Sequence, residues 1–234
     1  MDNALSIYED FLGEREGENH SFSFFRKPIR NVEPLRCITI PDIYRYIVGP
    51  YAQRQTETLR AIIDKDAARK YKAENFDFST FSGTFRIRNK NHLLLHSELL
   101  CIDFDHVADI PSLRERLLHD DCFETELLFR SPSGDGLKWV IDIERKGWEH
   151  SRFYNAVYNY LVASGYPEPD KSGSDVARSC FIPYDPEAYI NSKYPEYGLY
   201  RFCPWIAHAK TVSQISSCNG TRRTAGHVHP EVRI

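Results

Sequence analysis

Residues 99–106 of the chain, Leu-Leu-Cys-Ile-Asp-Phe-Asp-His, constrain the fold more than any other stretch. Four consecutive apolar residues are typical of a buried strand, and successive side chains of a strand point to opposite faces. Asp103 and Asp105 would therefore lie on the same face. Two buried carboxylates side by side repel each other unless a cation lies between them. The stretch predicts a strand with a divalent-cation site, and oxygen ligands suit Mg²⁺ or Mn²⁺.

An alternative interpretation of this stretch places both aspartates in water. If the strand ends at Ile102, Asp103 and Asp105 are solvated turn residues and bind nothing. Spacing alone does not separate the two interpretations, so the rest of the chain has to decide between them.

The composition is that of an ordinary globular protein, long enough for one large domain or two small ones. Of 234 residues, 41% are hydrophobic and 27% are charged, and the formal net charge is −3. This charge excludes a global basic field, so nucleic-acid binding would need a local patch. No apolar run approaches the ~20 residues that span a bilayer. Six cysteines without a CxxC pair, and no signal-peptide pattern, favour a reducing cytoplasmic location without a membrane.

Apolar periodicity predicts a mixed chain of helices and strands. A run with apolar residues at Leu59, Ile62 and Ile63 predicts a helix over residues 56–71, and Pro111 is expected to begin another helix. Strands are expected around residues 22–24, 76–80, 85–88, 99–106, 122–130, 139–143 and 179–182, and further helices over residues 41–48 and 148–163.

Arg86 and Arg88 alternate with Phe85 and Ile87, so both guanidinium groups would lie on one face of a strand. Such a pair could contact the phosphate backbone of a nucleic acid. It could equally be surface charge on a half-exposed strand.

The segment over residues 131–138, Ser-Pro-Ser-Gly-Asp-Gly-Leu-Lys, separates two expected strands and predicts a hairpin turn. Its hydroxyls, its glycines and its lysine are suited to a phosphate, because glycine lets the backbone approach an anion closely. The GxxxxGK[ST] order of a Walker A loop is absent, and an ordinary turn would use similar residues. The residues that would contact a nucleotide here are Ser131, Ser133, Gly134, Gly136 and Lys138.

A third motif supplies another carboxylate and another cation. Asp175 lies in a Ser- and Gly-rich loop, and Arg178 follows three residues later. Three carboxylates, a hydroxyl- and glycine-rich turn and two cations suit metal-dependent nucleotidyl transfer. In that chemistry two metal ions ~3.5–4 Å apart activate the attacking 3′ oxygen and stabilise the leaving pyrophosphate.

The order of these motifs resembles the archaeo-eukaryotic primase superfamily. More narrowly it resembles the primase-polymerase-related domain at the N-terminus of virulence-associated protein E-like proteins of Bacteroides-type mobile elements. The segments DFDH, SPSGDGLKW and SDVARSCFIPYD carry the resemblance within residues 70–190. It implies an α+β fold over residues 1–190: a palm with an RRM-like antiparallel sheet flanked by helices over residues 91–190, after an N-terminal α/β portion over residues 1–90.

The same resemblance implies a DNA primase/polymerase-type nucleotidyltransferase in the replication of a mobile element or phage. Its ligands would be Mg²⁺ or Mn²⁺ on Asp103, Asp105 and Asp175, a DNA template, and a nucleoside triphosphate on Ser131, Ser133, Lys138 and Arg178. A helicase of the same element would be a separate partner or part of a longer parent protein, because the chain has no Walker A motif.

One departure from the superfamily keeps other functions open. Many members have a histidine where this chain has Lys138, and lysine differs from histidine in geometry and proton chemistry. A catalytically degenerate nucleic-acid-binding module is the main alternative. A metal-dependent phosphoesterase or nuclease, and a purely structural α/β domain, are two others.

Residues 191–234 lack apolar periodicity, and Glu231 is the single carboxylate within residues 205–234. We expect a mobile basic extension there. The spacing of its cysteines and histidines matches no zinc-ligand pattern, so no zinc site is expected. The residues concerned are Cys203, His208, Cys218, His227 and His229.

Overall fold

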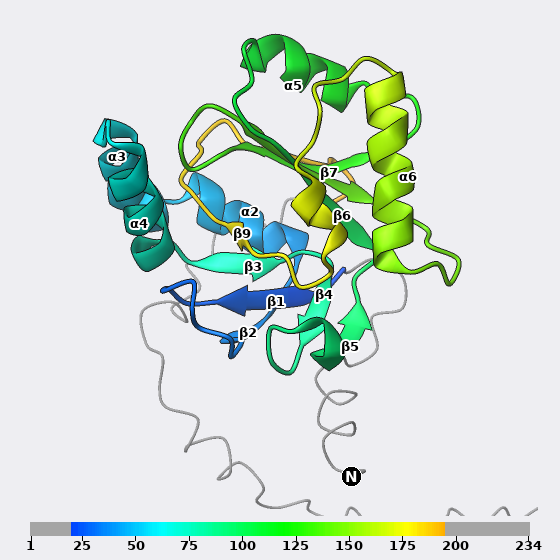
Figure 1. Ribbon diagram of the computed structural model, residues 1–234, viewed down its shortest axis with the longest axis horizontal. Coiled ribbons are helices and arrows are strands. Elements are labelled where there is room, and N and C mark those ends of the chain that lie inside the picture. The colour runs from blue at the N-terminus through cyan, green and yellow to red at the C-terminus, as the bar shows by residue number, and fades with distance from the viewer. Residues whose placement is uncertain (1–19, 195–234) are drawn as a thin grey trace, which may run out of the picture. The chain divides into compact units, whose positions relative to one another are not determined.

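The structure is a computed structural model that describes residues 20–194 (Figure 1). Two four-stranded sheets, both antiparallel throughout, form its framework. The first sheet has the order β2 (Arg36–Ile38), β1 (Phe22–Phe25), β3 (Phe78–Thr80), β9 (Cys180–Phe181), and the second has the order β10 (Tyr189–Ile190), β7 (Thr125–Arg130), β8 (Leu137–Asp142), β6 (Leu99–Phe104). A hairpin of β4 (Gly83–Phe85) and β5 (Leu93–His96) completes the strands. The prediction of an α+β fold with antiparallel sheets is confirmed.

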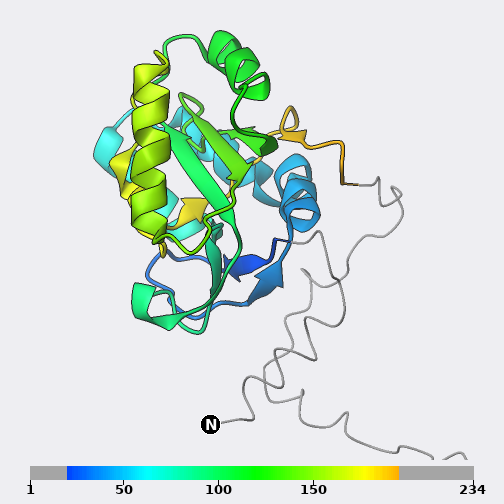
Figure 2. The same cartoon turned by 90° about the vertical axis from the view of Figure 1, so that its right-hand side faces the viewer.

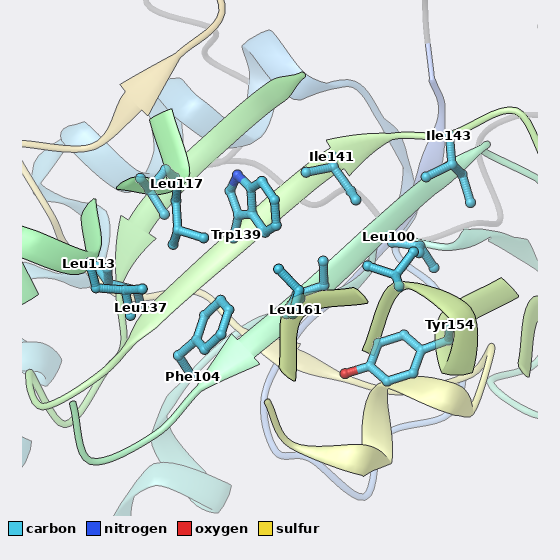
Figure 3. Close-up of a cluster of buried hydrophobic side chains, with 13 residues drawn as sticks. Leu100, Phe104, Leu113, Leu117, Leu137, Trp139, Ile141, Ile143, Tyr154 and Leu161 are labelled. Carbon is cyan, nitrogen blue, oxygen red and sulfur yellow. The ribbon is translucent and has the colours of Figure 1, made fainter. Parts of the chain in front are cut away.

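Helices cover one face of the second sheet, where the larger apolar core lies. Figures 1 and 2 show α5 (Ile110–Leu118) and α6 (His150–Ala163) on the same side of β6, β7 and β8. Figure 3 shows Trp139 at the centre of this core, among leucines of both helices. The Trp139 indole N–H donates to Thr125 Oγ1 at 2.7 Å, which satisfies its one buried donor. The remaining helix near this sheet, α2 (Ile40–Val48), contacts β7 and β10.

The alternation along β6 is the one that the sequence predicts. Leu100, Ile102 and Phe104 are buried in the core beneath α5 and α6. Asp103 therefore points to the opposite face, where it lines a pocket together with Cys180 of β9. The strand ends at Phe104, so Asp105 is not part of it. Asp105 is consequently an exposed residue directly after the strand, and it precedes His106 in a left-handed conformation (φ +52°).

Aromatic side chains hold the first sheet and attach it to the second. Phe25 and Phe78 stack at a centroid distance of 5.0 Å, and Phe78 meets Phe181 edge-on at 6.3 Å. Phe81, just after β3, lies 6.3 Å from Phe129 of β7. Aromatic pairs of this kind contribute about 0.5–1.5 kcal/mol each beyond their burial.

The helix predicted over residues 56–71 is wrong in its continuity. Two helices occupy this region, α3 (Gln53–Ala61) and α4 (Lys65–Asn75). Asp64 is the last residue of the segment between the two helices and caps α4, because its carboxylate accepts from Ala67 N at 2.7 Å. The apolar residues predicted to share one buried face therefore do not do so: Leu59 is 3% exposed but Ile63 is 97% exposed.

The strand predicted over residues 85–88 is also too long, since β4 ends at Phe85. The backbone then turns through η2 (Lys90–His92), and Arg86 N donates to His92 O at 3.0 Å. Arg86 is exposed and Arg88 is half-buried, so the two guanidinium groups do not share a strand face. The remaining 3₁₀ turns are η1 (Pro50–Ala52) and η3 (Lys171–Ser174).

The other predicted elements are confirmed, with ends shifted by a few residues. Pro111 lies in the first turn of α5 after the cap Asp109, and α6 ends at Ala163, with Ser164 as its C-cap before Gly165. The basic extension and its cysteines and histidines lie outside the described residues, except for residues 191–194. Among residues 20–194, no helix combines the length and apolarity needed to cross a bilayer.

Candidate metal and nucleotide site

Three carboxylates converge at the end of β6. Ligand atoms of Asp103, Asp105 and Asp170 all lie within 4.8 Å of one another. The backbone joins two of them, because Asp170 N donates to Asp103 O at 2.9 Å. Carboxylate oxygens in such a group are the ligands that Mg²⁺ and Mn²⁺ prefer. The strand-end pair is therefore part of a larger acidic group, as the sequence predicts, but with a different third member.

That third member is Asp170, at the start of η3, whereas the sequence pointed to Asp175 at its end. Asp175 lines the same pocket as Asp103 and Asp105, and its Oδ1 accepts from Ala177 N at 3.0 Å. It does not belong to the group within 4.8 Å. Metal binding by Asp175 stays a prediction, and Asp170 is the residue that the sequence analysis missed.

Asp170 looks like an ordinary helix cap in sequence, which is why its role was not seen. Its carboxylate accepts from Ser172 N at 2.9 Å and from Ser172 Oγ at 2.5 Å, as the cap of a short helical turn does. The one sign of its role in the sequence is Arg178, eight residues later. Arg178 Nη2 donates to Asp170 Oδ2 at 3.1 Å. Burial alone would raise the pKa of Asp170, but these hydrogen bonds and the charges of Arg178 and Lys138 lower it below its ordinary value.

The β7–β8 turn lies against this acidic group. Ser131 N donates to Gly136 O at 2.8 Å and Gly134 N donates to Ser131 O at 2.9 Å, which closes the turn at its base. Gly134 has φ +85°, a conformation that suits glycine. The prediction of a hairpin is confirmed, and Ser131 and Ser133 both line the pocket that Asp103 and Asp105 line.

Arg60 of α3 holds this turn from outside. Its Nε donates to Pro132 O at 3.2 Å and its Nη2 donates to Ser131 O at 3.3 Å. The guanidinium therefore adds two hydrogen bonds to those that close the turn. The N-terminal part of the chain therefore positions a segment that is more than 70 residues away in sequence.

The pocket that Asp103, Asp105, Ser131 and Ser133 line has a volume of about 280 Å³. Cationic side chains line it as well as these carboxylates. Lys138 Nζ contacts Asp103 Oδ2 directly, in agreement with the cross-strand pairing of these two residues. Burial lowers the pKa of the Lys138 ammonium, and the neighbouring charges of Lys72 and Arg178 act in the same direction. The four cations that line the pocket are Lys72, Arg88, Lys138 and Arg178. Arg86 is not among its lining residues.

Comparison with known proteins assigns the chain to a family. A family model described as "BT4734-like, N-terminal domain" matches residues 71–190, just over half of the chain. The chain belongs to the BT4734-like family. No curated protein and no solved structure gives a significant match.

The BT4734-like match contains the whole carboxylate group, the 131–136 turn and the four cations of the pocket. It leaves out β1, β2, α2 and α3, and therefore also Arg60. The part of the chain before residue 71 thus adds strands and helices around a site whose ionisable residues all come from the matched region.

Four residues that line the pocket have a buried polar atom without a hydrogen-bond partner among the described residues. The atoms are Arg88 Nε, Asp103 Oδ1, Ser131 Oγ and Ser179 Oγ, and those of Asp103 and Ser131 belong to the strand end and the turn. Ser131 is only 3% exposed, and a buried hydroxyl without a protein partner is available to a ligand in the pocket. A ligand with a cation near Asp103 and an acceptor near Ser131 would satisfy both.

We expect Ser131→Ala to separate a binding role from a structural one. Removing an unsatisfied buried hydroxyl should leave the free energy of unfolding unchanged or raise it slightly. If the hydroxyl donates to a bound nucleotide, the same change should weaken nucleotide binding by about 2–10-fold, the value of one hydrogen bond. Urea unfolding and nucleotide titration with Mn²⁺ present measure the two effects. A large loss of stability without any loss of affinity would contradict the assignment.

A histidine pair supports the loop that carries Asp170 and Asp175. His150 Nε2, at the start of α6, donates to Gly173 O of η3 at 3.0 Å. His96 Nε2 donates to His150 Nδ1 at 3.1 Å, and Glu98 N donates to His96 Nδ1 at 2.9 Å. Every ring nitrogen has one partner only if both imidazoles are neutral. Burial, followed by the charge of Arg145, lowers the pKa of His96 to about 3, and burial also lowers the pKa of His150.

Because both pKa values are lower in the folded than in the unfolded chain, acid should destabilise the fold through this pair. The unfolded histidines take up protons as the pH falls below about 6.5, whereas the folded pair does not, so unfolding is favoured. We expect His96→Gln/His150→Gln to be less stable than wild type at pH 7.5 but to lose less stability between pH 7.5 and 5.5. Urea unfolding at both pH values measures the difference. Equal pH slopes would contradict a neutral pair.

Proposed function

We propose that this chain is a metal-dependent nucleotidyltransferase of the DNA primase/polymerase type, acting in the replication of a mobile element or phage. The observation that carries the proposal is the pocket in which Asp103, Asp105 and the Ser131–Ser133 turn lie together with four cations. The second sheet, antiparallel and covered by α5 and α6 on one face, supports a palm with an RRM-like sheet.

The donor set fits Mg²⁺ or Mn²⁺. Asp103 Oδ1 is buried and unpartnered within the described part of the chain, and Asp105 and Asp170 add oxygens close by. A divalent ion bound there would lower the pKa of an attacking 3′ hydroxyl and stabilise charge on the reacting phosphate. Hard oxygen donors and the absence of sulfur or imidazole from this group of three favour these two metals over zinc.

The other residues of the pocket suit a nucleoside triphosphate. Arg88 and Arg178 can each hold a phosphate by two hydrogen bonds, and Lys72 adds a point charge. Ser131 would donate its hydroxyl to a phosphate oxygen. These fixed cations would offset the charge that builds up on the transferring phosphoryl group. A single-stranded DNA template is the second expected ligand, and a helicase of the same element is an expected partner.

Primer extension tests the proposal. The assay supplies a labelled primer on a DNA template, deoxynucleoside triphosphates and Mn²⁺ or Mg²⁺, with a parallel reaction on unprimed template and ribonucleotides. Extension or synthesis that requires the metal and the nucleotides supports the proposal. Cleavage of the DNA without added nucleotides would replace it with a nuclease or phosphoesterase.

The direct contact between Lys138 and Asp103 favours a second candidate, a degenerate nucleic-acid-binding module. An ammonium that already neutralises a metal ligand could preserve the fold without metal. Such a module predicts binding of single-stranded DNA that weakens steeply with salt and is unaffected by a chelator. Salt-dependent, chelator-insensitive binding with no primer extension would establish it in place of the enzyme.

A further inference from the structure

We infer that the carboxylate group binds a single divalent cation, and that the Lys138 ammonium takes the position in which a second one would be bound. This inference rests on the metal site of the proposed function and specifies its stoichiometry. It follows from the number of carboxylate oxygens that remain available for a metal ion.

One of the two oxygens of Asp103 has no partner among the described residues, and the other contacts a cation. Its Oδ2 contacts Lys138 Nζ, and its Oδ1 is buried without a partner among residues 20–194. Lys138 is only 8% exposed and lies directly opposite Asp103 in the β6–β8 ladder. A lysine held by its own strand in this register keeps its ammonium close to Asp103. The contact is therefore a fixed part of the sheet.

Asp170 also has little capacity left. A carboxylate oxygen offers two lone pairs, about four for the whole group. Oδ2 of Asp170 accepts from Ser172 Oγ at 2.5 Å and from Arg178 Nη2 at 3.1 Å, and Oδ1 accepts from Ser172 N at 2.9 Å. One lone pair remains, on Oδ1, and it can serve one ion.

Asp105 is the member of the group with both oxygens available. It makes no hydrogen bond or ion pair within the described part of the chain and it is exposed. Two ions ~3.5–4 Å apart need carboxylates that give one oxygen to each ion. Of the two oxygens of Asp103, only Oδ1 is free of a cation, because Oδ2 contacts the Lys138 ammonium. The available oxygens are enough for one ion on Asp103, Asp105 and Asp170.

Charge leads to the same stoichiometry. A second divalent ion on the Oδ2 side of Asp103 would lie next to the buried ammonium of Lys138, and like charges in a poorly solvated site repel strongly. The ammonium already supplies positive charge at this position. A second observation points to a ligand next to the ion: Ser131, which lines the same pocket, is only 3% exposed and its hydroxyl has no partner among the described residues.

Counting bound Mn²⁺ by electron paramagnetic resonance tests the inference without measuring activity. Wild type should bind one ion per chain. Lys138→Met, which removes the charge but keeps the length of the side chain, should bind two, because Asp103 Oδ2 becomes a ligand. Lys72→Met is the matched control: Lys72 lines the same pocket without an ion pair to Asp103, so this variant should still bind one ion.

Two ions on wild type, or one ion on a folded Lys138→Met, would overturn the inference. If Lys138→Met does not fold, Lys138→Gln serves the same purpose, because its neutral amide also removes the positive charge and its oxygen can lie next to a second ion. The number of Mn²⁺ ions bound to wild type tests the single-ion site and the proposed function separately. Binding of two ions refutes the single-ion site but leaves the proposed function standing, whereas binding of none refutes both.

Discussion

Asp105→Asn is expected to abolish Mn²⁺ binding and primer extension while leaving the fold intact. Asp105 is exposed, has no hydrogen bond or ion pair with the described residues, and lies just outside β6, so the isosteric amide should change the free energy of unfolding by less than about 0.5 kcal/mol. It nevertheless supplies the only carboxylate of the group with two unoccupied oxygens. Loss of residues that merely orient metal ligands costs 10–100-fold in metal affinity, so loss of a ligand should cost at least about 100-fold.

Asp105 is a better test than Asp103, although both belong to the group. Asp103→Asn would leave the Lys138 ammonium buried without a counter-ion, and a lost charge partner of this kind destabilises a fold by about 3–5 kcal/mol. A loss of activity would then have two explanations. Asp121→Asn provides the control, since Asp121 is exposed in the α5–β7 connection and does not line the pocket. Full activity of Asp105→Asn would refute the metal site.

The features that the sequence predicted are those with short-range causes. Alternation along β6 placed Ile102 and Phe104 in the core, and Ser, Pro and Gly residues between two apolar runs indicated the β7–β8 hairpin. In both cases the information lies within about ten residues, because strand alternation and turn conformation are local properties.

The features that were missed depend on contacts between distant segments. Asp170 joins Asp103 only because η3 packs against the end of β6, and its sequence signal is that of a cap. Arg60 lies in a helix that looks like a charged surface helix, yet its guanidinium holds the 131–134 turn. The pairing of Lys138 with Asp103 required the order of strands in the second sheet, in which β8 lies between β7 and β6. None of these neighbours can be inferred from periodicity.

The strand order explains how the site is assembled. Because β8 pairs with both β7 and β6, the turn that enters β8 lies beside the end of β6. Val107 N donates to Asp135 O at 2.8 Å, and His106 Nδ1 lies 2.7 Å from Asp135 Oδ2, so the segment after Asp105 is attached to the turn. The hydroxyls of the turn and the carboxylates of β6 therefore form one unit, and a change in their contact should affect both stability and metal binding.

Gly136→Ala is expected to disrupt this unit. A Cβ at Gly136 would overlap the carbonyl oxygen of Phe104 and would lie 3.3 Å from the Cα of Asp105. Neither neighbour is the end of a flexible side chain, so the turn and the end of β6 have to separate. Overpacking of this kind costs about 1–3 kcal/mol, and we expect the upper part of this range for a clash with backbone. Because Asp105 moves with the strand end, Mn²⁺ binding should weaken as well.

Gly147→Ala distinguishes a steric effect from a conformational one. Gly147 has φ +82° and nothing within 4 Å of an added Cβ, so alanine there should cost only about 1–2 kcal/mol of backbone strain and should leave Mn²⁺ binding unchanged. Urea unfolding and Mn²⁺ titration of both variants measure the two properties. If Gly136→Ala lowered the stability but bound Mn²⁺ like wild type, the position of Asp105 would not depend on the turn. The carboxylates would then be held by their other contacts, which are Lys138 for Asp103, and η3, Arg178 and Tyr154 for Asp170.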